Sequence, residues 1–90
     1  MSVLFFGDPA GALALVDRGI PLVGLVHGRP GGRGRRALTP HLKGLPRWHL
    51  PDLSDTSIID ALTETAPRLI VSYFYPRTIP HSVLQLAPGI

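Results

Sequence analysis

The chain opens with a short apolar run that ends abruptly. Residues 3–6 read Val-Leu-Phe-Phe without a polar residue, and residues 7–9 read Gly-Asp-Pro. A strand with one face in water alternates apolar and polar residues, whereas an uninterrupted apolar strand is typical of a parallel sheet covered by helices on both faces. The run therefore predicts a strand over residues 2–6 in the interior of such a sheet.

The following residues predict a crossover to a second parallel strand. Asp8 suits the N-cap of a helix, and Pro9 suits its first turn, where the missing N–H is no loss. We expect a short helix over residues 10–18, apolar all round and therefore well buried, which Gly19 ends. A second apolar run occupies residues 20–27. A strand, helix and strand of this length form a right-handed crossover that places the two strands side by side and parallel.

The rest of the chain continues the alternation without an internal repeat. We expect a short segment at 41–44, a brief edge strand at 47–50, a helix at 54–65 with Ser54 as its N-cap, a strand at 69–71 and a helix at 80–86. This order predicts the α/β class, with a Rossmann-like doubly wound parallel sheet of about four strands. The outer edge of the fourth strand is expected to lie open unless another strand pairs with it.

Composition excludes several other classes. Ninety residues with 44% hydrophobic content fit one small folded domain and argue against global disorder. No apolar run reaches the ~18 residues of a membrane span, and the amino terminus lacks a signal-type segment, so we expect a cytoplasmic protein. The chain has no cysteine, and its four histidines show no metal-ligand spacing. The glycine pattern lacks the fingerprints of NAD-binding and ATP-binding loops.

An arginine cluster stands out in the glycine-rich and proline-rich loop at 28–40. Arg29, Arg33, Arg35 and Arg36 lie within eight positions of one another. A short charge run is most often a solvated loop. Guanidinium groups also make bidentate contacts to phosphate, so the same cluster could bind a nucleic acid or a nucleotide. The residues alone leave both interpretations open.

Ligands of open α/β sheets bind outside the carboxyl ends of the strands. The turn at 7–9 and the loops at 28–40 and 73–78 are therefore expected to share one rim. Aromatic residues near this rim could stack on a flat heterocycle or simply pack on the core; they are Trp48, Tyr73, Phe74 and Tyr75.

Three segments in this order resemble one known family. They are FFGDP at 5–9, PGGRGRRALTP at 30–40 and PRLIVSYFYPRTIPHSVLQLAPGI at 67–90. Together they resemble the amino-terminal half of the formyl-tetrahydrofolate-dependent formyltransferases, in particular the members that act on methionyl-tRNA or on an amino sugar nucleotide. The resemblance implies a Rossmann-like fold and transfer of a formyl group from 10-formyltetrahydrofolate to an amine.

The resemblance also implies roles for particular residues. Folate would lie against the backbone of the loop after the fourth strand, at Tyr75, Pro76, Arg77, Thr78 and Ile79. The tRNA acceptor end would meet Arg33, Arg35 and Arg36. The chain departs from the family pattern at Asp8, where a Thr or Ser is common, and at Pro76 in the folate loop.

The family's catalytic Asn, His and Asp would belong to the strand and loop that begin after Ile90. We therefore expect a domain truncated before the catalytic strand, with no catalytic residue of its own and no turnover alone. The alternative function is a non-catalytic module that binds RNA or a nucleotide through the loop at 29–36, and a structural remnant with neither activity is a third. The formyl acceptor and the oligomeric state do not follow from the sequence.

Overall fold

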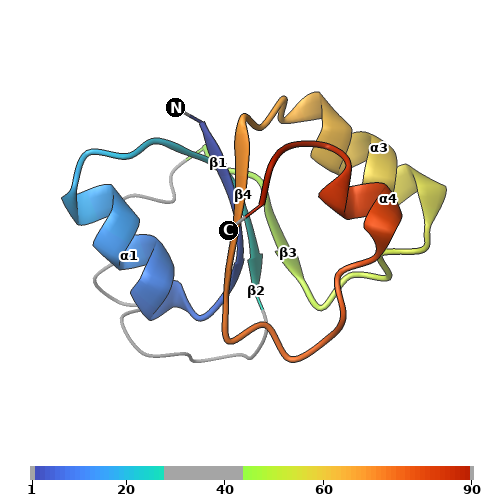
Figure 1. Ribbon diagram of the computed structural model, residues 1–90, viewed down its shortest axis with the longest axis horizontal. Helices are drawn as coiled ribbons and strands as arrows, with labels where there is room; N and C mark the ends of the chain where they lie inside the picture. The colour runs from blue at the N-terminus through green and yellow to red at the C-terminus, as the bar shows by residue number, and fades with distance from the viewer. Residues whose placement is uncertain (1, 28–43, 90) are drawn as a thin grey trace.

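The centre of the molecule is a parallel sheet that runs between two layers of helices (Figure 1). The computed structural model describes residues 2–27 and 44–89. The strands are β1 (Val3–Gly7), β2 (Leu22–His27), β3 (Arg47–His49) and β4 (Leu69–Tyr73). The helices are α1 (Pro9–Asp17), α3 (Thr56–Glu64) and α4 (His81–Leu84). The strand order is β3-β2-β1-β4 and every pair is parallel, so the α/β Rossmann-like prediction is confirmed.

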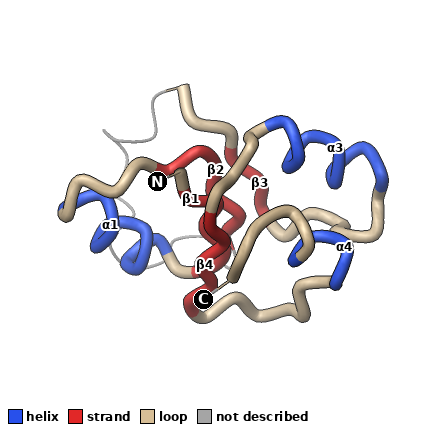
Figure 2. The backbone as a smooth tube through the Cα atoms, turned by 45° about the horizontal axis from the view of Figure 1, so that its top comes forward, coloured by secondary structure: helices blue, strands red, loops and turns tan. Residues whose placement is uncertain are grey.

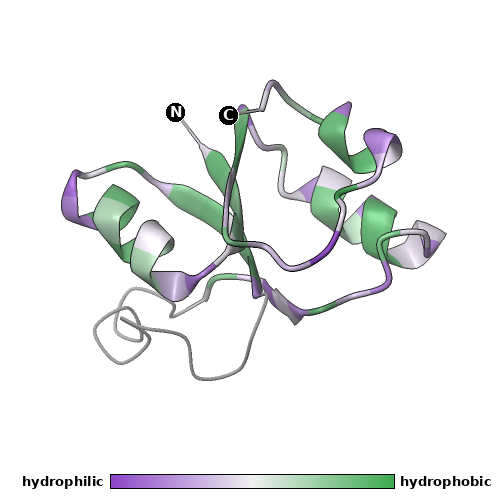
Figure 3. Ribbon diagram, turned by 60° about the horizontal axis from the view of Figure 1, so that its bottom comes forward, coloured by the Kyte–Doolittle hydropathy of each residue, from purple (hydrophilic) through white to green (hydrophobic). Residues whose placement is uncertain are grey.

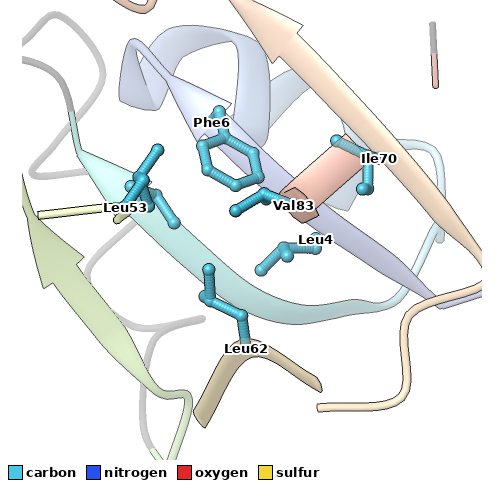
Figure 4. Close-up of a cluster of buried hydrophobic side chains, with 7 residues drawn as sticks. Leu4, Phe6, Leu53, Leu62, Ile70 and Val83 are labelled. Carbon is cyan, nitrogen blue, oxygen red and sulfur yellow. The ribbon is translucent and has the colours of Figure 1, made fainter. Parts of the chain in front are cut away.

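Strand β1 is an interior strand of the sheet, since it pairs with β2 on one side and with β4 on the other. All of its residues are buried. Its side chains alternate between two apolar clusters. Leu4 and Phe6 pack on the side of α3 and α4 (Figure 4), together with Val26, Leu53, Leu62, Ile70 and Val83. Val3 and Phe5 pack on the side of α1, with Ala12 and Leu25. An apolar residue at every position therefore has a burial site, as the sequence predicts.

Helix α1 begins as expected but is less buried than expected. The Asp8 carboxylate accepts a hydrogen bond from the Ala10 N–H at 3.0 Å, and Pro9 occupies the first turn. Only Pro9 and Ala12 are fully buried, while Ala14 is exposed. The prediction of a well-buried helix is wrong, because one layer of helix can press only one face against a sheet. Much of α1 is nevertheless apolar (Figure 3).

Helix α3 begins at a different residue from the one predicted. Asp55 is its N-cap and accepts hydrogen bonds from the N–H and hydroxyl of Ser57, at 2.9 and 2.8 Å. The Ser54 hydroxyl instead donates to the Asp52 carboxylate at 2.6 Å. Ser54 therefore belongs to the preceding turn. A carboxylate one residue later accepts the free N–H groups of the first turn in its place.

The remaining boundaries differ by a few residues. Strand β4 continues to Tyr73 rather than residue 71, because its pairing with β1 continues until Gly7 lies opposite Tyr73. Helix α4 covers only residues 81–84, and a long loop connects β4 to it (Figure 2). No helix in the described ranges is long and apolar enough to cross a membrane. The segment expected at 41–44 lies outside the described residues, apart from Gly44.

Candidate functional site

The carboxyl ends of the strands meet at one edge of the sheet, as a parallel arrangement requires. Gly7, at the end of β1, is the register partner of His27 on one side and of Tyr73 on the other. The Asp8 N–H donates to the Tyr73 carbonyl at 2.9 Å, and the Leu50 N–H donates to the His27 carbonyl at 3.1 Å. The turn at 7–9 and the loop at 73–78 therefore share a rim, as predicted. The loop at 28–40 lies outside the described residues.

Gly7 permits this close approach because it has no side chain. Its φ is +131°, a backbone region that favours glycine, and a Cβ placed on it would lie 1.9 Å from the Tyr73 carbonyl oxygen. A glycine is therefore required at the end of the apolar run, because a side chain there would collide with the neighbouring strand.

Tyr75 leaves a polar group without a partner at this edge. Its ring packs edge-on against Phe6, with centroids 5.5 Å apart and an angle of 84° between the planes. Its hydroxyl oxygen is buried and has no hydrogen-bond partner within the described part of the chain. Burial raises the pKa of Tyr75, and the positive charge of Arg77 opposes that rise. A buried hydroxyl of this kind is costly unless a ligand or another group bonds to it.

Arg77 connects two loops of the rim. Its guanidinium donates to the Leu50 carbonyl at 3.3 Å, joining the loop after β4 to the turn after β3. Leu50 has a φ of +44°. In the same turn, hydrogen bonds from the Ser54 hydroxyl and N–H hold the pKa of Asp52 below its ordinary value, and the Arg77 charge adds a smaller lowering.

The backbone of the loop after β4 has unused hydrogen-bonding groups. Among the described residues, nothing accepts from the N–H groups of Arg77, Thr78 and Ile79. Pro76, Arg77 and Thr78 are exposed, whereas the side chains of Tyr75 and Ile79 are half-buried and pack against the core. This loop can therefore offer main-chain donors and acceptors to the polar edge of a heterocycle while its apolar side chains anchor it. The assignment of these residues to folate stays a prediction.

Two exposed aromatic residues lie at the end of β4, of which Tyr73 is the last strand residue and Phe74 follows it. Tyr73 is 43% exposed and Phe74 is 72% exposed, and their ring centroids lie 4.5 Å apart. Phe74 also has a φ of +56°, which is unusual for a residue with a large side chain. The sequence suggested aromatic stacking here, but it did not indicate that Tyr73 also borders a cavity.

That cavity is an open groove of about 340 Å³ between α1 and β4. Its walls are mostly apolar and consist of Phe5, Ala10, Gly11, Ala14, Leu15, Val71, Ser72 and Tyr73. Sequence reasoning missed it, because it depends on the small residues of α1 lying over the outermost strand. Gly11 is the only sequence signal, since a Cβ there would meet the rings of Phe5 and Tyr73 at 2.7 and 2.9 Å.

Arg33, Arg35 and Arg36, the predicted substrate-binding residues, lie outside the described ranges. Within those ranges no group of three or more His, Asp or Glu side chains is placed to hold a metal ion.

Comparison with known proteins finds one group of relatives. No protein-family model matches the chain. A methionyl-tRNA formyltransferase from Pelobacter propionicus is 31% identical over 97% of this chain and 31% of its own length. One from Chloroflexus aggregans is 32% identical over 98% of this chain and 32% of its own length. The chain resembles the formyltransferases.

The solved structures support the fold of this formyltransferase-like chain. Phosphoribosylglycinamide formyltransferase from Streptococcus pneumoniae TIGR4 superposes with a TM-score of 0.61, over 94% of this chain and 50% of that chain, at 9% identity. At such low identity the likeness shows the fold alone. The formyltransferase-like chain spans about a third of the length of the curated relatives it matches.

Proposed function

We propose that the chain is the folate-binding portion of a formyltransferase that uses 10-formyltetrahydrofolate as the formyl donor. The observation that carries this proposal is the 31% identity to a methionyl-tRNA formyltransferase over nearly the whole chain. The rim at the carboxyl ends of the strands supports it, because open α/β sheets bind ligands there.

The chemistry of the loop at 75–79 fits a folate. A pterin ring has a flat face and a polar edge rich in donors and acceptors. The unpaired N–H groups of Arg77, Thr78 and Ile79 could bond to that edge. The buried Tyr75 hydroxyl lacks a partner among the described residues, and a ligand would supply one.

The formyl donor would supply the formyl group, and protein residues would have to supply the catalytic groups. Attack of an amine on a formyl group places negative charge on the carbonyl oxygen and releases a proton, so the reaction needs a positioned donor and a base. His27 and His49 are register partners at the rim, but within the described residues no group of three or more His, Asp or Glu side chains comes together. We therefore expect no turnover from the 90-residue chain alone, and measurable formyl transfer by it would contradict this part of the proposal.

The acceptor is proposed to be the amine of methionyl-tRNA or of an amino sugar nucleotide, in the cytoplasm. Arg33, Arg35 and Arg36 would contact its phosphates. Their place in the sequence supports this role, because the loop begins directly after β2 at the same rim.

Thermal unfolding with and without 10-formyltetrahydrofolate tests donor binding. A ligand that binds only the folded state at ~100 times its Kd stabilises by about 2.7 kcal/mol, a shift of about 10 °C or more for a domain of this size. Tyr75→Phe removes the hydroxyl and keeps the ring, and we expect it to weaken binding roughly fivefold. Tyr73→Phe is the matched control and should bind normally.

The same purified chain can distinguish the proposed folate-binding function from the competing RNA-binding function. A non-catalytic RNA-binding module would show no folate shift, but it would bind RNA with a steep salt dependence. Replacing Arg33, Arg35 and Arg36 by Ala would then remove that dependence. The arginine cluster of the sequence is the observation behind this second candidate, and it fits the acceptor phosphates of the first candidate equally well.

A further inference from the structure

The loop at 75–79 is fixed to the core at its two ends. Tyr75 and Ile79 are half-buried and pack against the cluster that contains Phe6. The residues between them, at 76–78, are exposed, and within the described ranges no backbone hydrogen bond joins them to another part of the chain. The packing of its ends therefore leaves the middle of the loop free to take several arrangements.

The Arg77 side chain connects this middle part to the sheet. Its guanidinium donates to the carbonyl of Leu50 at 3.3 Å, and Leu50 lies in the turn after β3, 27 positions earlier in the chain. The Leu50 N–H in turn donates to the His27 carbonyl at the end of β2, at 3.1 Å. Two successive hydrogen bonds thus join the middle of the loop to the rim of the sheet.

The residue that accepts the Arg77 hydrogen bond has an unusual backbone. Leu50 has a φ of +44°, and a residue with a side chain loses about 1 kcal/mol or more in this left-handed region. Such a conformation persists only where the surroundings impose it, and the hydrogen bonds at the N–H and carbonyl of Leu50 do so. Strain of this kind is typical of positions whose geometry serves a function.

We propose that Arg77 is a positioning residue of the donor site: by bonding to the Leu50 carbonyl, its side chain fixes the N–H groups at 77–79 in the arrangement that binds the polar edge of the donor. The inference rests on the proposed function, because it concerns the same folate-binding loop. A ligand that binds a backbone already held in place orders fewer groups on binding, so the Arg77 contact raises affinity without touching the ligand.

Two variants and a control test the contact in the ligand-free chain. Arg77→Met removes the guanidinium and keeps an aliphatic side chain, whereas Arg77→Lys keeps a donor of similar reach. Arg68→Met is the matched control, since Arg68 is exposed and precedes β4 at its opposite end. Hydrogen exchange at the Leu50 amide should be at least about threefold faster in Arg77→Met than in the wild-type chain and unchanged in Arg68→Met.

Titration with 10-formyltetrahydrofolate then measures the effect on donor affinity. We expect Arg77→Met to raise the Kd at least about fivefold, Arg77→Lys to recover most of the affinity, and Arg68→Met to stay within about twofold of the wild-type value. The ligand-free variants should melt within about 3 °C of the wild-type chain, so that a loss of affinity is not a loss of fold.

Salt distinguishes positioning from direct binding of the donor's charged groups. A hydrogen bond from Arg77 to a backbone carbonyl is no ion pair with the ligand. The ratio of the Kd of Arg77→Met to that of the wild-type chain should therefore be the same at low and high ionic strength.

Three results would overturn the proposal. The first is an unchanged exchange rate of the Leu50 amide in Arg77→Met. The second is an unchanged donor affinity in Arg77→Met when the wild-type chain does bind the donor. The third is a ratio of Kd values that approaches one at high salt, because Arg77 would then bind the donor directly. A wild-type chain that binds no donor would contradict the proposed function and this role together, whereas the second result contradicts this role alone.

Discussion

At the scale of single residues, two glycines show how differently a positive φ can constrain a chain. Gly7 has its φ of +131° beside a neighbouring strand, whereas Gly19 has a φ of +75° and no other atom within 4 Å of the position that a Cβ would occupy. Both suit glycine for their backbone conformation. Only Gly7 also has to leave space for a carbonyl oxygen.

Alanine substitution should separate these two effects. Gly19→Ala adds only left-handed strain and should cost about 1 kcal/mol of unfolding free energy. Gly7→Ala must also displace the Tyr73 carbonyl, so we expect a loss of at least about 3 kcal/mol, measured by urea unfolding. Equal losses of unfolding free energy for the two variants would contradict the close approach of Gly7 to the Tyr73 carbonyl.

Tyr75 allows a prediction about alkaline pH. Its pKa is raised by burial, so the unfolded phenol ionises near its ordinary 10.0 while the folded phenol is still protonated. Stability is therefore fully present below that pH and falls as the pH rises toward the folded pKa. Tyr75→Phe should lose this fall, and at pH 7 it should be neutral or stabilising by up to about 1 kcal/mol, because it removes a buried hydroxyl without a partner.

Urea unfolding at pH 7 and at about pH 11 measures this effect. Tyr73→Phe is the control at pH 7 and should leave stability unchanged, because Tyr73 is 43% exposed. A clear destabilisation by Tyr75→Phe at pH 7 would mean that its hydroxyl has a protein partner after all.

At the scale of elements, helix boundaries depend on local competition between side chains. The stretch from Asp52 to Ser57 offers several residues that can cap a helix, and the sequence pattern does not rank them. In the structure Asp52 accepts from Ser54, which leaves Asp55 to cap α3. The existence of α3 could be predicted from its apolar spacing, but its first residue could not.

Two single substitutions check this assignment. Asp55→Ala removes the acceptor for the Ser57 N–H and should cost about 1 kcal/mol of unfolding free energy. Ser54→Ala changes only an exposed turn and should cost less than about 0.5 kcal/mol. A larger loss of unfolding free energy for Ser54→Ala than for Asp55→Ala, measured by urea unfolding, would indicate that Ser54 is the N-cap.

At the scale of the whole molecule, the sheet and its rim follow from the sequence, whereas the surfaces do not. The unbroken apolar run at 3–6 requires burial on both faces, and this alone places β1 inside a parallel sheet. Parallel strands then bring their carboxyl ends to one edge, which predicts the rim. The Arg77 contact to Leu50 and the groove under α1 both involve residues that are distant in the chain. Such contacts cannot be predicted from the periodicity of apolar residues.

The position of β1 between β2 and β4 has a consequence for biosynthesis. Of the four strands, β1 is synthesised first and lies in the interior of the sheet, yet one of its two neighbours is β4, which begins at residue 69. Most of the chain must therefore be synthesised before both faces of β1 are covered and both of its edges are paired. Such long-range pairing slows folding. The nascent chain is therefore exposed to aggregation for longer than a protein whose first strand needs only an early neighbour.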